Sequence, residues 1–201
     1  MNIFLLDWNI QQCAEWHCDK HVVKMPLETT QMLSTVHWRY TNDGPYLPVH
    51  ANHPCTLWAG ETRDNYFWLW KLGIALCEEY TYRYGRVHAC ENVLHGIKYP
   101  PIPLQTRGFS KFPQAMPDEY KNEDPIMAYR QYYINDKARI CRWKNRPIPP
   151  FMMGAMFTHS NDEASPSLER SSIMRLSALC VKMIYLSYYQ TEGFAAPNVR
   201  I

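Results

Sequence analysis

The chain has 201 residues, the length of one compact domain, and a domain of this size buries enough surface to fold without disulfides or metals. Hydrophobic residues make up 46% and charged residues 20%, which excludes a disordered chain; the formal net charge of +2 is too small to indicate a polyanionic partner by itself. Charged residues interrupt the apolar stretches well before the length of a membrane span, so we expect no membrane partner.

The seven cysteines are an odd number and form no CxxC pair. This pattern indicates neither a disulfide framework nor a zinc knuckle. The opening residues, MNIFLLDWNI, lack the basic region of a secretion signal. We therefore expect reduced thiols, a cytoplasmic location, and neither a cofactor nor a bound metal.

Apolar residues recur at helical spacing over residues 12–40, which predicts one long amphipathic helix with Pro26 inside it. Its expected core face consists of Cys18, Val22, Met25, Thr29, Met32, Leu33 and Val36. The turn-rich residues 41–48 end the helix.

A second helix is predicted to open with Asn52 as its cap and Pro54 in its first turn. It runs to Tyr84, with a break near Gly60, and it stops at Gly85.

Residues 86–123 are rich in proline and lack a sustained period, so we expect an irregular connection with at most a helical turn near 91–95. The Asp124-Pro125 pair predicts a helix that continues to about Lys144, and residues 146–151 break it. A final helix is predicted over 166–190. The fold class is therefore all-α, a compact single-domain, bundle-like arrangement of helices.

The first candidate site is a polar stripe beside the core face of the first helix. Its members, spaced by three or four residues, fall within about 80° of arc on a helix: His17, His21, Lys24, Glu28 and Gln31. Neighbouring imidazoles disfavour a charged ammonium, so Lys24 is a candidate amine nucleophile with Glu28 as proton carrier. The alternative is a solvated helix face without chemistry.

A metal site is a further interpretation of the same stripe. His17 and His21 have the spacing of a helical HxxxH pair, but the glutamate of the HExxH pattern is absent. Under this interpretation the protein is a metal-dependent hydrolase that uses His17 and His21.

The second candidate site is HANHP, residues 50–54. Asn52 and His53 stand next to the first free amides of a predicted helix, where a phosphate of DNA binds readily. The alternative is that Asn52 is an ordinary cap and His53 a surface residue.

The third candidate site is KARICRWKNR, residues 137–146. Its cations surround an aromatic ring and include no acidic residue; they are Lys137, Arg139, Arg142, Lys144 and Arg146, with Trp143 among them. This composition favours a surface that follows the phosphates of DNA, whereas a helix C-terminus alone explains only some of the cations.

Taken in chain order, several segments resemble the phage pyrimidine dimer DNA glycosylases, the endonuclease V family. The segments are MNIFLL followed by CAEWHCDKHVVKMPLETTQML, then NHP, WLWKLGIALCEEYTYRYG, MPDEYK with DPIMAYRQYYINDKARI, and KNRPIPPF. The resemblance implies a glycosylase-like helical domain over residues 1–150. Residues 151–201 have no counterpart, and we expect them to form a helical extension packed on the same domain.

The family implies an enzyme that opens a base pair, attacks the sugar with an amine and cleaves at the abasic site through a Schiff base. Family members use the amine of a small second residue, whereas Asn2 is bulky here. The sequence therefore leaves three alternatives open: the amine nucleophile is Lys24, it is the amine of Met1, or it is absent. If Pro26 is aligned with the family's helix proline, Lys24 takes the place of the catalytic glutamate, and Glu28 lies one turn on. We expect a DNA-processing enzyme, a glycosylase and abasic-site lyase for a damaged or modified base; the alternative is a non-catalytic binding module for nucleic acid or protein.

Overall fold

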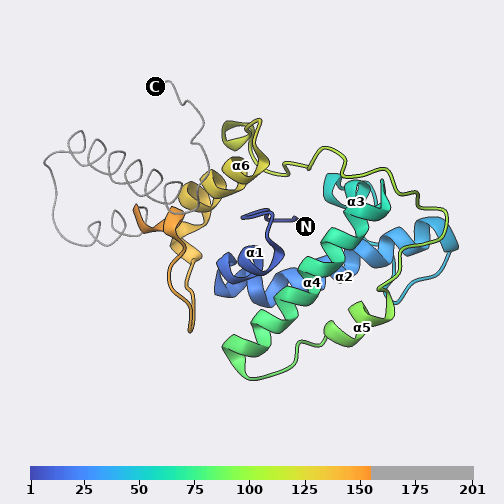
Figure 1. Ribbon diagram of the computed structural model, residues 1–201, viewed down its shortest axis with the longest axis horizontal. Coiled ribbons are helices and arrows are strands. Elements are labelled where there is room, and N and C mark those ends of the chain that lie inside the picture. Colours follow the sequence, from blue (N-terminus) through green and yellow to red (C-terminus); the bar gives the residue numbers. More distant parts are fainter. Residues whose placement is uncertain (155–201) are drawn as a thin grey trace, which may run out of the picture. The chain divides into compact units, whose positions relative to one another are not determined.

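The computed structural model describes residues 1–154, and within this range the chain forms helices and no strand (Figure 1). The expected all-α class is confirmed for this part. The helix expected over 166–190 lies outside it. The chain divides into two compact units, Met1–Ile148 and Pro149–Ile201, and the second contributes one described 3₁₀ turn, Pro150–Met152.

The expected first helix is two helices, α1 (Ile10–Trp16) and α2 (Asp19–Thr41). The prediction of one continuous helix is wrong at residues 17–18, where both backbones are extended. The side chain of Arg83 explains how the break is tolerated, because its Nη2 donates 2.8 Å to the carbonyl of Glu15 near the open end of α1. The expected core face of α2 is confirmed, since all seven of its residues are buried.

The expected second helix is also divided. It forms α3 (Pro54–Ala59) and α4 (Arg63–Tyr84), with the break at Gly60 as expected. Thr62 caps α4 by accepting from the amide of Asn65, and Gly85 ends it in the left-handed conformation, φ 67°. The cap expected at Asn52 is wrong: the residue that caps α3 is His53, whose ring accepts a hydrogen bond from the amide of Cys55.

The second half of the first unit is less regular. A short helix, α5 (Glu91–Gly96), confirms the expected turn. After a single 3₁₀ turn at Asp118–Tyr120, α6 (Pro125–Tyr132) begins at the expected Asp124 cap and continues as a π-helical turn and a 3₁₀ turn to Ile140. The helix expected to reach Lys144 therefore stops four residues earlier.

The core forms where α2 and α1 pack against α4 (Figure 1). The N-terminal segment is part of this core, because its residues Ile3, Phe4, Leu5 and Leu6 are all buried. Burial of this segment fixes the position of Met1 and Asn2, and both residues belong to the candidate site described below. Within residues 1–154, no helix combines the length and the apolar character needed to cross a lipid bilayer.

Candidate active site

The N-terminus of the chain lies at the carboxylate of Glu28. The α-amine of Met1 is 3.8 Å from Glu28 Oε2, and the amide of Asn2 donates 2.8 Å to the same oxygen. The other carboxylate oxygen, Oε1, is 2.9 Å from the Nζ of Lys24. One carboxylate whose side chain is only 9% exposed therefore meets two amines.

Side chains of three other segments hold the first two residues in place. The side chain of Met1 is 2% exposed, and its sulfur accepts a hydrogen bond of 3.4 Å from the hydroxyl of Thr56. The Oδ1 of Asn2 accepts from the hydroxyl of Tyr129 at 2.9 Å, and its Nδ2 donates to the carbonyl of Ala115 at 2.9 Å. The contacts of the Met1 and Asn2 side chains thus hold the α-amine in place.

His53 lies beside this group at the start of α3. The next residue but one, Cys55, has its thiol 3.7 Å from Asn2 Oδ1. Burial lowers the pKa of His53, and the positive charges of the Met1 amine and His50 lower it further, whereas Glu28 opposes them. Asn52, the expected cap, is exposed, and the ring of His53 caps the helix in its place. That Asn52 and His53 contact a phosphate stays a prediction.

Lys24 is where the sequence places it, one turn before Glu28, but its surroundings differ from the expectation. Its side chain is 67% exposed and its ammonium is paired with Glu28. His17 caps the end of α1 and is not on α2, so the polar stripe predicted from the spacing is wrong at this residue. His21 is on α2, three residues before Lys24, but its ring is buried and bonded to the hydroxyl of Tyr133.

His17 and His21 instead belong to a buried aromatic cluster. The ring of His21 stacks on Phe4 at 4.3 Å and bonds to the hydroxyl of Tyr133. His17 is fully buried, and its Nδ1 lies 2.6 Å from the carbonyl of Cys13. Burial lowers the pKa of His17 to about 3, so the ring is neutral at physiological pH. Through Phe4, this cluster helps to fix the N-terminal segment.

The metal interpretation gains no third ligand. Nowhere in residues 1–154 do three His, Cys, Asp or Glu side chains come together in a group that could hold a metal ion.

The basic segment 137–146 is only partly available to a ligand. Arg146 is engaged internally, with Nη2 2.8 Å from Glu79 and 3.4 Å from Glu15. Trp143 is buried and its indole N–H donates 3.0 Å to the carbonyl of Trp16, so the expectation of a ring open to stacking is wrong.

The remaining cations of the segment differ in exposure. Lys137 is paired with Asp136 at 2.7 Å. Arg139, Arg142 and Lys144 are exposed, and the backbone amide of Lys144 is held by the carboxylate of Asp19 at 3.0 Å. These three side chains are the part of the predicted DNA-binding cluster that can meet phosphates.

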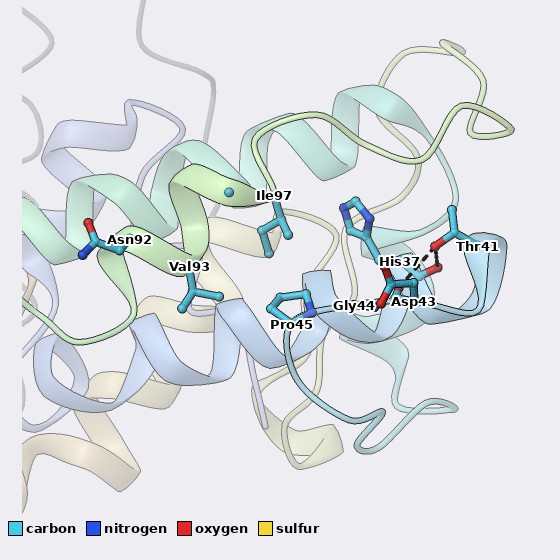
Figure 2. Close-up of a pocket in the computed structure, with 9 residues that line it drawn as sticks. His37, Thr41, Asp43, Gly44, Pro45, Asn92, Val93 and Ile97 are labelled. Atoms are coloured by element: carbon cyan, nitrogen blue, oxygen red, sulfur yellow. Dashed lines mark hydrogen bonds between the residues drawn. The ribbon is translucent and has the colours of Figure 1, made fainter.

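An open hollow of about 580 Å³ lies elsewhere, between the end of α2 and α5 (Figure 2). His37 and Asp43 line one side of it, and Asn92 and Val93 the other. The Nε2 of His37 is already bonded to the hydroxyl of Tyr66 at 2.9 Å. None of the residues that the sequence singles out lines this hollow, and it carries no functional assignment.

Sequence reasoning missed three members of the site, Asn2, Thr56 and Tyr129, because they come from separate segments and form no local motif, and it named the Met1 amine only as an alternative to Lys24. The one signal was the resemblance, which implies an N-terminal amine near a helix carboxylate. Comparison of the chain with family models, curated proteins and solved structures finds no match.

Proposed function

We propose that the protein is a DNA glycosylase and abasic-site lyase that acts on a damaged or modified base through an amine nucleophile. The observation that carries the proposal is the meeting of two amines, the Met1 α-amine and the Lys24 side chain, at one shielded carboxylate, Glu28. Schiff-base chemistry needs an amine next to a group that accepts and returns protons, and this pair supplies both.

The Met1 α-amine is the better nucleophile of the two. As a class, α-amino groups in water give up their proton about two to three pH units below lysine side chains. Lys24 is exposed, and its Nζ is engaged by the carboxylate in an ion pair of 2.9 Å. Met1 is 3.8 Å away, and its buried side chain keeps the amine in one place.

The proposed reaction uses only groups already placed at the site. In the glycosylase step, the amine nitrogen bonds to C1′ of the sugar while the bond from C1′ to the base breaks, and the base leaves with that electron pair. Glu28 takes the proton that the amine releases. Glu28 then gives this proton to the ring oxygen O4′ as the C1′–O4′ bond breaks, and the nitrogen lone pair forms the C1′=N imine. The imine makes the C2′ proton acidic; the carboxylate removes it, and the 3′ phosphate leaves with the electrons of its C–O bond.

DNA binding is proposed to use the exposed cations of residues 139–144. Arg139, Arg142 and Lys144 support it, because exposed cations are able to neutralise phosphates. A terminal nitrogen of Arg142 also donates 2.7 Å to the carbonyl of Cys141, and the Lys144 ammonium lies over the ring of Tyr84. Extrusion of the target base costs a few kcal/mol, which contacts of this kind have to offset.

Borohydride trapping on DNA with a single abasic site tests the proposal. Schiff-base chemistry predicts a covalent adduct, and peptide mapping of that adduct by mass spectrometry is expected to place the sugar remnant on Met1 and not on Lys24. An intact-mass measurement on the same sample establishes which residue carries the free α-amine. Absence of any adduct, combined with measurable DNA binding, would favour the non-catalytic binding module on the same fold.

A further inference from the structure

The start of α3 is built against the first two residues of the chain. Thr56 bonds to the sulfur of Met1, and the thiol of Cys55 lies 3.7 Å from Asn2 Oδ1. His53, the cap of the same helix, is close enough for the Met1 amine and Glu28 to act on its charge. The imidazole therefore belongs to the end of α3 that contacts the first two residues, through Cys55 and Thr56, and it lies on a different element from the amine and the carboxylate.

The hydrogen bond at Nδ1 fixes the tautomer of His53. The amide of Cys55 donates to Nδ1 at 3.2 Å, so this nitrogen keeps its lone pair and the ring proton sits on Nε2. A second proton on Nδ1 would point at the amide proton of Cys55 and break the cap. The Met1 amine and His50, which add positive charge nearby, also oppose it. The ring is thus held neutral with one N–H donor.

The backbone before His53 forms a constrained turn. His50 has φ 47°, a left-handed conformation that is costly for a residue with a side chain, and its carbonyl accepts from the amide of His53 at 2.9 Å. The half-buried ring makes no hydrogen bond through Nε2 to any residue in 1–154. His53 thus follows a constrained turn, its ring has one fixed tautomer, and its Nε2–H is available as a donor.

We infer that His53 is a third catalytic residue, which donates a hydrogen bond from Nε2–H to the oxygen on C1′ of the open abasic sugar. The inference rests on the proposed function. When the amine attacks the C1′ aldehyde, an N–C bond forms and the π electrons of the carbonyl move onto its oxygen. The neutral imidazole stabilises that developing charge without giving up its own proton.

Glu28 completes the proton balance of this step. It removes one proton from the Met1 ammonium before the attack and a second from the nitrogen after the N–C bond has formed, and it passes both to the C1′ oxygen, which leaves as water. The products are the protonated imine and one water molecule, and no oxidant or further reactant is needed. His53 is unchanged at the end of the step.

Two substitutions of His53 test separately the hydrogen bond that Nε2–H is proposed to donate and the helix cap that Nδ1 forms. Asparagine places an oxygen near the position of Nδ1 and is among the best helix caps, but it is too short to place a donor at Nε2. Glutamine places an amide N–H near Nε2 but is a poor cap. The borohydride trapping rate at saturating abasic DNA, the Kd for the same DNA measured by fluorescence anisotropy, and the melting temperature are compared for both variants and the wild type.

We expect His53→Asn to keep the melting temperature and the Kd while its trapping rate falls by about 10- to 100-fold, as for loss of one oxyanion donor. We expect His53→Gln to melt about 2–4 °C lower because the cap is lost, yet to trap faster than His53→Asn. A wild-type trapping rate in His53→Asn would overturn the inference and leave the proposed function intact. A raised Kd with an unchanged rate would make His53 a phosphate ligand and overturn it as well. Absence of trapping in the wild type would overturn both proposals.

Discussion

The backbone amide of Asn2 donates a hydrogen bond of 2.8 Å to Glu28 Oε2, across 26 residues of sequence. The same oxygen is 3.8 Å from the Met1 amine. The first peptide group is therefore fastened to the carboxylate that is proposed to move protons, and the amine can approach or leave it only by local rotation about the Met1 backbone. A nucleophile fixed in this way loses little entropy when the substrate arrives.

Replacement of Glu28 by glutamine is the direct test of this carboxylate. Glutamine retains an oxygen for the Asn2 amide but cannot carry protons at neutral pH. We expect the trapping rate to fall by about 10²- to 10⁴-fold, the range for loss of a general acid–base. The matched control is Glu78→Gln, an exposed glutamate on α4, which should trap as the wild type does. A Glu28→Gln variant with an unaltered rate would remove the carboxylate from the mechanism.

Much of the helical framework can be predicted from the sequence, because its signals are local. The Asp124-Pro125 start, the stop at Gly85 and the break near Gly60 depend on residues within a turn of each boundary, and all three are confirmed. The division at His17 could not be predicted, because the group that satisfies the open end of α1 is Arg83, from a distant helix.

Most contacts of the candidate site could not be predicted either, because they also join residues that are distant in the sequence. Spacing correctly brings Lys24 and Glu28 together, since they lie one turn apart on one helix. The pairing of Glu28 with Met1, and of Asn2 with Tyr129, joins segments up to 127 residues apart and leaves no periodic trace. Trp143 was misjudged for the related reason that its indole partner, the carbonyl of Trp16, is supplied by tertiary packing.

The choice between the two amines gives a second prediction. We expect Lys24→Ala to trap abasic DNA within a few-fold of the wild type, because the Met1 amine remains at Glu28. Extension of the chain by two residues before Met1 moves the free amine by up to about 7 Å, and we expect it to abolish trapping. The control is Lys20→Ala, an exposed lysine one turn earlier. Loss of the adduct in Lys24→Ala, with survival in the extended chain, would assign the chemistry to Lys24.

The exposed cations of residues 139–144 give a third prediction. Replacement of Arg139, Arg142 and Lys144 by alanine should weaken DNA binding and reduce the slope of log K against log salt by about one unit per lost phosphate contact. The measurement is anisotropy across a salt series. The triple replacement of Lys71, Lys98 and Arg107, exposed cations of other segments, is the charge-matched control. Equal changes in both variants would mean that this segment is not the DNA surface.

The buried ion network around Arg83 gives a fourth prediction. Arg83 is 1% exposed, and its guanidinium lies 2.6 Å from Glu79 and 2.8 Å from Asp19. Substitution by methionine leaves Glu79, also 1% exposed, with less compensating charge, and we expect the free energy of unfolding to fall by about 3–5 kcal/mol. Urea unfolding measures it, with Arg86→Met, at an exposed position, as the control. A loss under about 1 kcal/mol would show that water or rearrangement compensates the network.

Stability should also depend on pH through His17. Burial lowers the pKa of this ring from 6.5 to about 3, so the unfolded chain binds one more proton than the folded chain between these values. The free energy of unfolding contributed by His17 is therefore fully present above pH 6.5, and it is lost at about 1.4 kcal/mol per pH unit as the pH falls toward 3.

The measurement is urea unfolding of the wild type and of His17→Asn at pH 7 and pH 5. Asparagine retains a donor for the carbonyl of Cys13, which the ring contacts at 2.6 Å, but it does not titrate. Between these two pH values the wild type should lose about 2 kcal/mol more than the variant, the share that protonation of an unfolded histidine contributes. The control is His95→Asn, an exposed histidine, which should follow the wild type. If the wild type and His17→Asn lose the same free energy, the ring of His17 takes up its proton in the folded protein, and the buried cluster of Phe4, His17 and His21 that fixes the N-terminal segment is open to water.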